Sequence, residues 1–163
     1  MRLLVTGTPG VGKTSISKEL GKRLKCKVVN EMEFALQKGI GEWDSVENEL
    51  EVPVKKLENG LNIYLKKQDN VLLEGHLLCV TKLKVDFAVL IRLHPEVLET
   101  RLENKGYRPD KIMDNVFCEG IDYCKKRLAR KYQSKNIIEV QSGKNIKEIA
   151  LIIIKRLKEA GLS

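Results

Sequence analysis

Apolar residues along this chain fall into short unbroken runs, which alternate with stretches where they recur every three or four positions. The unbroken runs are rich in Val, Leu and Ile, as is typical of strands buried on both faces of a parallel sheet. They predict strands at residues 2–6, 28–29, 71–73, 87–93 and 137–140.

The periodic stretches predict amphipathic helices at residues 14–25, 53–65, 95–102, 110–131 and 146–160. Pro53 and Pro95 suit the first turn of a helix, where a missing N–H costs no hydrogen bond. Asn145 with Glu148 resembles a capping box for the last helix. Residues 31–50 show no clear period, and we expect them to be irregular.

Strands and helices alternate through the whole chain. This order predicts a three-layer α/β fold: a parallel five-stranded sheet with helices on both faces and right-handed crossovers. The 163 residues suffice for one hydrophobic core, and no repeat or Pro/Gly/Ser-rich linker divides them. We therefore expect a single domain over residues 1–163.

Composition narrows the class of protein. Apolar residues make up 42% and charged residues 32% of the chain, which is typical of a globular domain and not of a disordered one. No apolar run reaches the ~18 residues of a membrane helix, and the N-terminus lacks a signal-peptide pattern. We expect a cytoplasmic protein without membrane contact. The four cysteines form no Cys-x-x-Cys pair and there are two histidines, so free thiols are expected and a zinc site is not.

Charge is unevenly distributed. The formal net charge is +8, and residues 105–135 alone carry nine basic and four acidic side chains. A basic field favours phosphate-bearing partners such as nucleotides or RNA, although a Lys-rich solvated surface gives the same pattern. Residues 31–51 are acidic, which suits either a solvated loop or a docking segment for a basic partner.

One motif carries specific chemistry. Gly7-Thr8-Pro9-Gly10-Val11-Gly12-Lys13-Thr14 fits G-x-x-x-x-G-K-[ST], between a predicted strand and a predicted helix. We expect the phosphates of ATP to lie against the backbone of Gly10, Val11 and Gly12 and at the start of the helix. Lys13 is expected at the β- and γ-phosphates, the Thr14 hydroxyl on Mg²⁺, and Ser15 at the α-phosphate.

The rest of the chain favours one class of P-loop protein. It lacks the Asp-x-x-Gly and Asn-Lys-x-Asp motifs of Ras-like GTPases, and it is short for a motor or transporter ATPase. A small kinase fits its length. Such enzymes cover the acceptor with a mobile segment and the transferred phosphate with a basic lid, which excludes water. Residues 30–53 and 104–114 are the candidates for these segments, although each could also be an ordinary loop.

Four further side chains are candidates for catalysis. Glu74 ends a predicted strand and is expected to hold Mg²⁺ through water or to orient the acceptor. His76 is expected to position the acceptor phosphate or an attacking water. Arg92 ends another strand, where open α/β sheets bind ligands, and Arg101 precedes the lid by one turn. Structural roles in caps, packing or surface ion pairs remain open for all four.

Several of these sequences together resemble one known family. They are the P-loop, Glu74-Gly75-His76, Arg92, Arg101-Leu102-Glu103-x-x-Gly106-Tyr107 and Asp114-Asn115-x-x-Cys118-Glu119. Over nearly the whole chain they resemble the adenylate kinase isoenzyme 6 family, P-loop nucleoside monophosphate kinases that also act as ATPases in small ribosomal subunit maturation. The resemblance implies that residues 30–53 bind the monophosphate, that residues 104–114 form the lid, and that Lys144 lies beside the adenine.

Two positions depart from the family pattern. Glu74 stands where the family usually has Asp, and Lys105 stands where Arg usually precedes Gly-Tyr. Lysine cannot bind phosphate bidentately, so Arg108 is the alternative cation for the lid.

The leading hypothesis is an adenylate kinase that uses ATP, Mg²⁺ and AMP, hydrolyses ATP, and acts in 16S/18S rRNA maturation with a small-subunit ribosomal protein or pre-rRNA as partner. An ATPase switch in ribosome assembly with little kinase activity is the alternative. A kinase for another acceptor, such as a sugar or shikimate, is the third. We expect a monomer or a weak dimer.

Overall fold

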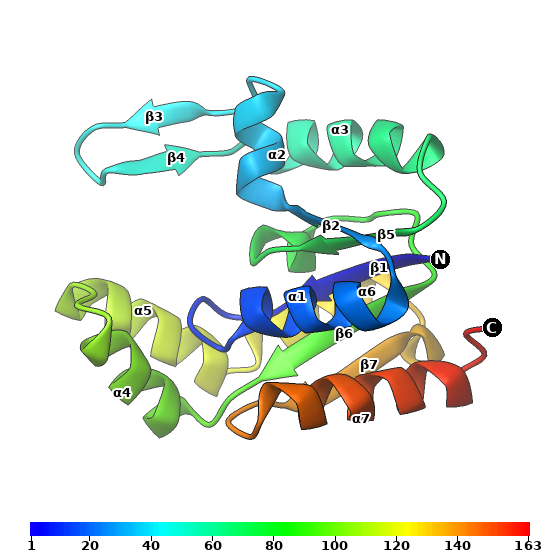
Figure 1. Cartoon of the computed structure of the whole chain (residues 1–163). Helices are drawn as coiled ribbons and strands as arrows, with labels where there is room; N and C mark the ends of the chain where they lie inside the picture. Colours follow the sequence, from blue (N-terminus) through cyan, green and yellow to red (C-terminus); the bar gives the residue numbers. More distant parts are fainter.

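The fold is built on a parallel sheet. A computed structural model describes residues 1–163, and its strands follow the order β2-β5-β1-β6-β7, with every neighbouring pair parallel (Figure 1). The strands are β1 (Arg2–Thr6), β2 (Lys27–Asn30), β5 (Val71–Glu74), β6 (Phe87–Arg92) and β7 (Ile137–Gln141). Helices cover both faces of this five-stranded sheet, which confirms the predicted α/β fold.

Successive side chains of each strand point to opposite faces of the sheet, so the hydrophobic core has two halves. In β1, Leu3 and Val5 pack on one face of the sheet and Leu4 packs on the other. The first face is covered by α1 (Lys13–Leu24), α4 (Pro95–Asn104) and α7 (Ile146–Glu159). The second face is covered by α2 (Glu31–Gln37), α3 (Val54–Lys66), the short 3-10 helix η1 (Leu77–Val80) and α6 (Tyr123–Lys131). The helices α1, α3, α4 and α7 are therefore held by the apolar stripes that their sequence periods predict. None of the helices has the length and apolar content to cross a membrane.

The order of the strands fixes where a ligand can bind. From β1 the chain passes to β2 on one side of the sheet, and from β5 it crosses over β1 to β6 on the other side. Connections that leave a parallel sheet in opposite directions open a crevice at the carboxyl ends of the strands. The loop after β1, which contains the P-loop motif, lies at this crevice (Figure 1).

The helix boundaries confirm two of the predicted start signals. Asn145 caps α7, where its Oδ1 accepts hydrogen bonds from the N–H groups of Lys147 (2.9 Å) and Glu148 (3.4 Å). Pro95 is the first residue of α4, as its fixed φ predicts.

Residues 31–50 are more regular than expected. The side chain of Asn30 accepts hydrogen bonds from the N–H groups of Met32 (2.9 Å) and Glu33 (3.1 Å) and so starts α2. An antiparallel hairpin follows, formed by β3 (Glu42–Asp44) and β4 (Glu49–Glu51). The prediction of irregular structure was wrong because α2 is only two turns long and the hairpin strands are mostly exposed, so neither element shows an apolar period.

The long helix predicted at residues 110–131 is two helices, α5 (Pro109–Gly120) and α6, and that prediction was also wrong. Asp122 between them takes a left-handed conformation with φ of 59°, which ends the helical path. Its carboxylate forms an ion pair with Arg92 at the end of β6. A tertiary contact therefore sets the break. A short 3-10 turn, η2 (Ser134–Asn136), then leads into β7.

Packing of α3 gives a test of the core. Leu61 is fully buried, whereas Ile63 on the same helix is 58% exposed. We expect Leu61→Ala to lower the free energy of unfolding by about 2–5 kcal/mol, because it leaves a cavity among apolar side chains. Ile63→Ala is the matched control and should change it by less than ~0.5 kcal/mol. Urea denaturation followed by circular dichroism measures both, and equal effects would contradict this packing.

Candidate nucleotide-binding site

Two glycines let the P-loop backbone pack tightly. Gly10 has φ of +93° and Gly12 has φ of +101°, in the region that side chains disfavour. A Cβ on Gly10 would lie 2.7 Å from Leu102 Cδ2 and 2.9 Å from Leu98 Cδ1, both on α4. The loop therefore lies directly against α4, which ends at the predicted lid.

The P-loop leads directly into the start of α1, where backbone N–H groups lack partners within the helix. This helix begins at Lys13 and has no side-chain cap, so its first N–H groups depend on a ligand or water for a partner. Oriented N–H groups and the helix dipole attract anions. The carbonyl of Val11 accepts hydrogen bonds from Ser142 Oγ (2.6 Å) and Arg101 Nη1 (3.4 Å), which fix the loop from two other segments.

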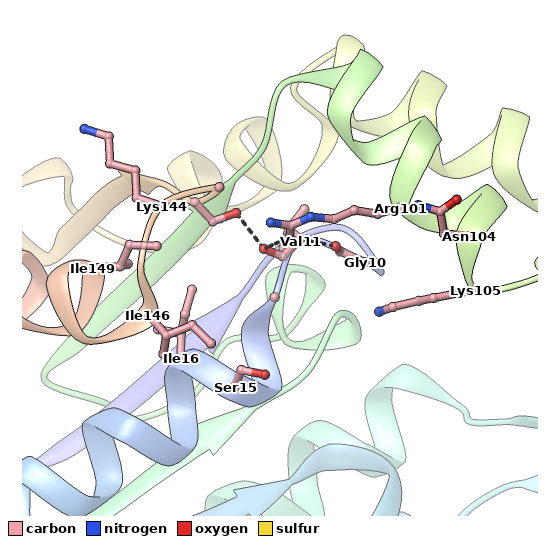
Figure 2. A pocket seen from close by; sticks show the side chains of 13 residues that line it. Gly10, Val11, Ser15, Ile16, Arg101, Asn104, Lys105, Lys144, Ile146 and Ile149 are labelled. Carbon is pink, nitrogen blue, oxygen red and sulfur yellow. Dashed lines mark hydrogen bonds between the residues drawn. The ribbon is translucent and has the colours of Figure 1, made fainter.

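A pocket of about 440 Å³ opens beside the loop (Figure 2). Three cationic side chains line it: Arg101, Lys105 and Lys144. Three isoleucines give it an apolar part: Ile16, Ile146 and Ile149. The remaining residues of its wall are Gly10, Val11, Gly12, Ser15, Asn104, Ser142 and Gly143. One end therefore suits an anionic group and the other a flat apolar one.

Glu74 joins three elements at the carboxyl ends of the strands. Its side chain is buried at the end of β5. Its Oε1 accepts hydrogen bonds from Asn30 Nδ2 (2.7 Å) and Thr14 Oγ1 (3.3 Å). A carboxylate and a hydroxyl in contact are hard oxygen donors, which is the ligand set that Mg²⁺ prefers. Glu74 and Thr14 therefore fit the magnesium site expected from the sequence.

Lys13 lies against its own loop. Its ammonium group donates a hydrogen bond to the carbonyl of Thr8 (3.0 Å). Burial lowers the pKa of Lys13, and the nearby carboxylates of Glu31 and Glu74 partly oppose this. An anion that enters the loop would meet a cation already freed from bulk water.

His76 lies under the P-loop, next to two thiols. Its Nδ1 donates a hydrogen bond to the carbonyl of Gly7 (3.1 Å) and is 3.8 Å from Cys124 Sγ. Burial lowers the pKa of His76, but its contact with Cys124 outweighs this and the net shift is upward. The hydrogen bond from Cys79 and the proximity of His76 lower the pKa of Cys124, whereas the pKa of Cys79 is raised.

Glu31 is a buried carboxyl that the sequence analysis did not single out. It begins α2, is 4% exposed, and its Oε1 accepts a hydrogen bond from the N–H of Leu77 (2.9 Å). Its Oε2 is buried without a partner. Gly75 passes so close that a Cβ there would lie 2.1 Å from the Glu31 carboxyl carbon. Burial raises the pKa of Glu31 to about 7, although the Leu77 N–H and the charges of His76 and Lys13 oppose this.

Arg92 is not among the residues that line the pocket, contrary to expectation. Its guanidinium forms ion pairs with Glu119 and Asp122, and a longer one with Glu139 (3.4 Å). These carboxylates come from α5, the α5–α6 junction and β7. Arg92 ties these elements to β6 in the structure.

The two predicted cover segments touch each other. Arg108, at the start of α5, forms ion pairs with Glu47 in the hairpin turn (2.7 Å) and with Asp110 (3.3 Å). Lys111 reaches Glu47 (3.6 Å) and Glu49 (3.4 Å). Arg108 is therefore occupied by carboxylates, whereas Lys105 lines the pocket.

The sequence analysis did not single out Glu31, Cys79 or Cys124, and only Glu31 had a signal in the sequence. Glu31 lies two positions after the strand predicted at residues 28–29, as Glu74 ends another, so its place near the carboxyl edge of the sheet could have been inferred. Cys79 and Cys124 are 45 positions apart and meet only through the packing of η1 on α6.

The site can now be compared with known proteins. Residues 3–122 match the family model described as AAA domain. The chain is 39% identical over 150 residues to a protein of Pyrococcus furiosus named "Putative adenylate kinase", covering 91% of this chain and 79% of the relative. A protein of the same name from Thermococcus kodakarensis is 38% identical over 97% of this chain and 86% of its own length. The chain belongs to the family of these archaeal proteins.

Solved structures agree on the architecture. Shikimate kinase from Aquifex aeolicus superimposes with a TM-score of 0.67, over 98% of this chain and 97% of that one, at 20% identity. At such identity the likeness establishes the fold, which is that of P-loop kinases.

The buried carboxyl of Glu31 gives a pH-dependent prediction. Its pKa rises from 4.5 to about 7 on folding, so between these values the folded protein binds a proton that the unfolded chain has released. The free energy of unfolding should therefore fall as pH rises through this window. Glu31→Gln removes the charge. The free energy of unfolding of this variant should exceed that of the wild type by about 3 kcal/mol at pH 8 but by only about 1 kcal/mol at pH 5, because a tenfold change in proton affinity is worth ~1.4 kcal/mol.

Urea denaturation at the two pH values measures this difference. Glu33→Gln is the matched control, because Glu33 lies in the same turn of α2 but is exposed, and this substitution should change the free energy of unfolding by less than ~0.5 kcal/mol. A Glu31→Gln variant with the pH dependence of the wild type would contradict a buried, protonated Glu31.

Proposed function

We propose that this protein is an adenylate kinase, which transfers the γ-phosphate of ATP to AMP. The observation that carries the proposal is the pocket in which a P-loop at a helix start meets three cationic side chains, with an apolar part beside it. The names of the archaeal relatives support the choice of adenylate kinase within the P-loop kinases. We treat residues 1–163 as one catalytic domain.

ATP would lie along the pocket. Its phosphates would be held by the backbone of Gly10, Val11 and Gly12, by Lys13, and by the hydroxyls of Thr14 and Ser15. Its base would lie on the apolar part beside Lys144, where Ile146 and Ile149 offer flat contact. Thr14 directly and Glu74 through water would hold Mg²⁺, which neutralises phosphate charge when bound.

AMP would bind between the segment at residues 30–53 and the lid at residues 104–114. Glu74 and His76 lie at the carboxyl end of β5, where they could orient the acceptor phosphate. Arg101 and Lys105 extend from the end of α4 into the pocket and could stabilise the transferred phosphate. Phosphoryl transfer needs this positioning and charge neutralisation more than covalent participation by the protein. We assign Arg92 a supporting role, since three carboxylates surround it.

We further propose that the protein hydrolyses ATP and acts in maturation of the small ribosomal subunit, as the resemblance to adenylate kinase isoenzyme 6 implies. The hairpin of β3 and β4 supports a protein partner. Its acidic strand β3 carries the exposed side chain of Trp43 (61%), and the turn after it carries that of Val46 (83%). Acidic surfaces attract Lys- and Arg-rich proteins. A basic ribosomal protein would be the partner of this hairpin, whereas pre-rRNA would be the partner of the basic residues 105–135.

The proposed activity is tested by the formation of ADP from ATP and Mg²⁺, with and without AMP. We expect AMP to raise the rate strongly and Lys13→Ala to lower it by about 10²–10³-fold, because the cation stabilises charge that develops in the transition state. ATP binding should weaken less than turnover. Lys22→Ala is the control, since Lys22 is exposed in the last turn of the same helix.

Other outcomes of this assay point to other functions. Slow hydrolysis that ignores AMP would favour an ATPase switch in ribosome assembly, whose rate should respond to its partner. ADP release that requires a sugar or another metabolite would favour a different acceptor. Near-normal turnover of Lys13→Ala would contradict the P-loop site itself.

The lid cation can be assigned by two matched substitutions. Lys105 lines the pocket, whereas Arg108 is paired with Glu47 and Asp110. We expect Lys105→Ala to lower kcat/KM for transfer by tenfold or more, about 1.4 kcal/mol of transition-state binding, and Arg108→Ala to have a smaller effect. Lys105→Arg should preserve or raise transfer. The opposite ranking would assign the lid role to Arg108.

A further inference from the structure

Three metal-binding side chains meet beneath the P-loop. His76 follows β5, Cys79 lies on η1, and Cys124 lies in the first turn of α6. One ligand atom from each residue lies within 4.8 Å of the other two. These residues are distinct from the hard oxygen donors, Thr14 and Glu74, that fit Mg²⁺.

The spacing of the ligand atoms can be compared with that around one small ion. Zinc binds sulfur at about 2.3 Å and imidazole nitrogen at about 2.0–2.1 Å, so a tetrahedral ion holds two sulfurs about 3.8 Å apart and a sulfur and a nitrogen about 3.6 Å apart. Cys124 Sγ lies 3.8 Å from His76 Nδ1. Side-chain adjustments of a few tenths of an ångström would bring these two atoms to the spacing of ligands on one ion.

The surroundings bury two of the ligands and place a cation near them. Cys79 is fully buried and Cys124 is 4% exposed, on a backbone fixed by the core of the second face of the sheet. The positively charged side chain of Lys13 lies near both thiols and would repel an isolated divalent cation. A divalent ion with two thiolates carries no net charge, so the bound form would avoid that repulsion.

We propose that His76, Cys79 and Cys124 form a site for a borderline-soft divalent ion, with Zn²⁺ strongly preferred over Mg²⁺. Two Sγ–metal bonds and one Nδ1–metal bond form. Each thiol releases one proton to solvent, the Nδ1 hydrogen of His76 leaves to solvent while Nε2 takes one up so that the imidazole stays neutral, and no atom changes its oxidation state. A water completes the coordination on the side of His76, which is the least buried of the three ligands.

Metal binding would also change a contact of the P-loop. In the structure, His76 Nδ1 donates its hydrogen to the carbonyl of Gly7, the first residue of the motif. The same nitrogen cannot hold a hydrogen and a metal at once, so the ion would replace this hydrogen bond.

The test uses the full-length, reduced protein with Zn²⁺ for calorimetry and Cd²⁺ for spectroscopy. We expect one equivalent of either ion to bind, with a thiolate-to-cadmium charge-transfer band in the ultraviolet. Cys79→Ser and Cys124→Ser should lose the band and weaken binding by more than roughly 100-fold, since even partners outside the coordination shell are worth 10–100-fold. Cys118→Ser is the matched control and should bind like the wild type, because Cys118 on α5 lies outside the cluster.

A second measurement uses the wild type alone, because the cysteine variants could fold poorly. X-ray absorption at the zinc edge should show two sulfur ligands and at least one imidazole nitrogen at the distances above. A shell made of oxygen, one sulfur ligand only, or no stoichiometric binding would overturn the proposal. So would wild-type affinity in a folded Cys79→Ser variant.

Discussion

The carboxylate of Glu74 connects the elements that form the site. It ends the buried strand β5 and accepts hydrogen bonds from Asn30 at the end of β2 and from Thr14 in α1. Asn30 in turn caps α2, so one side chain joins the strand end to the start of the segment that we assign to the acceptor. A buried carboxylate without such donors would be strongly destabilising. The positions of the P-loop helix and of the acceptor segment therefore depend on the same polar contact.

The sequence predicted the sheet and most helices because their signals are local. Val- and Leu-rich runs mark the strands, and Asn145 and Pro95 mark helix starts. The two errors arise where the signal is not local. The break between α5 and α6 rests on Asp122, which is held in a left-handed conformation beside Arg92 from a distant strand. The hairpin strands are three residues long and mostly exposed, so they carry no apolar period.

In the candidate site, too, the residues with a local sequence signal could be predicted and the others could not. A contiguous motif identified the P-loop, because its chemistry requires fixed spacing along the chain. The environment of Glu31, the pairing of Arg92 and the meeting of Cys79 with Cys124 depend on residues that are distant in sequence. Spacing along the chain could not show that three carboxylates would surround Arg92, or that Gly75 would pass against the carboxyl group of Glu31. These contacts required the structure.

The ion pairs between the hairpin and α5 have a consequence for how the molecule responds to its solution. Arg108 and Lys111 meet Glu47 and Glu49 across a gap between two segments that share no other strong contact of this kind. All four side chains are at least a third exposed, so dissolved ions compete directly with their attraction. Rising ionic strength would loosen this connection while leaving the buried core unchanged. If these two segments cover the acceptor as we propose, the access of small molecules to the crevice would depend on salt concentration.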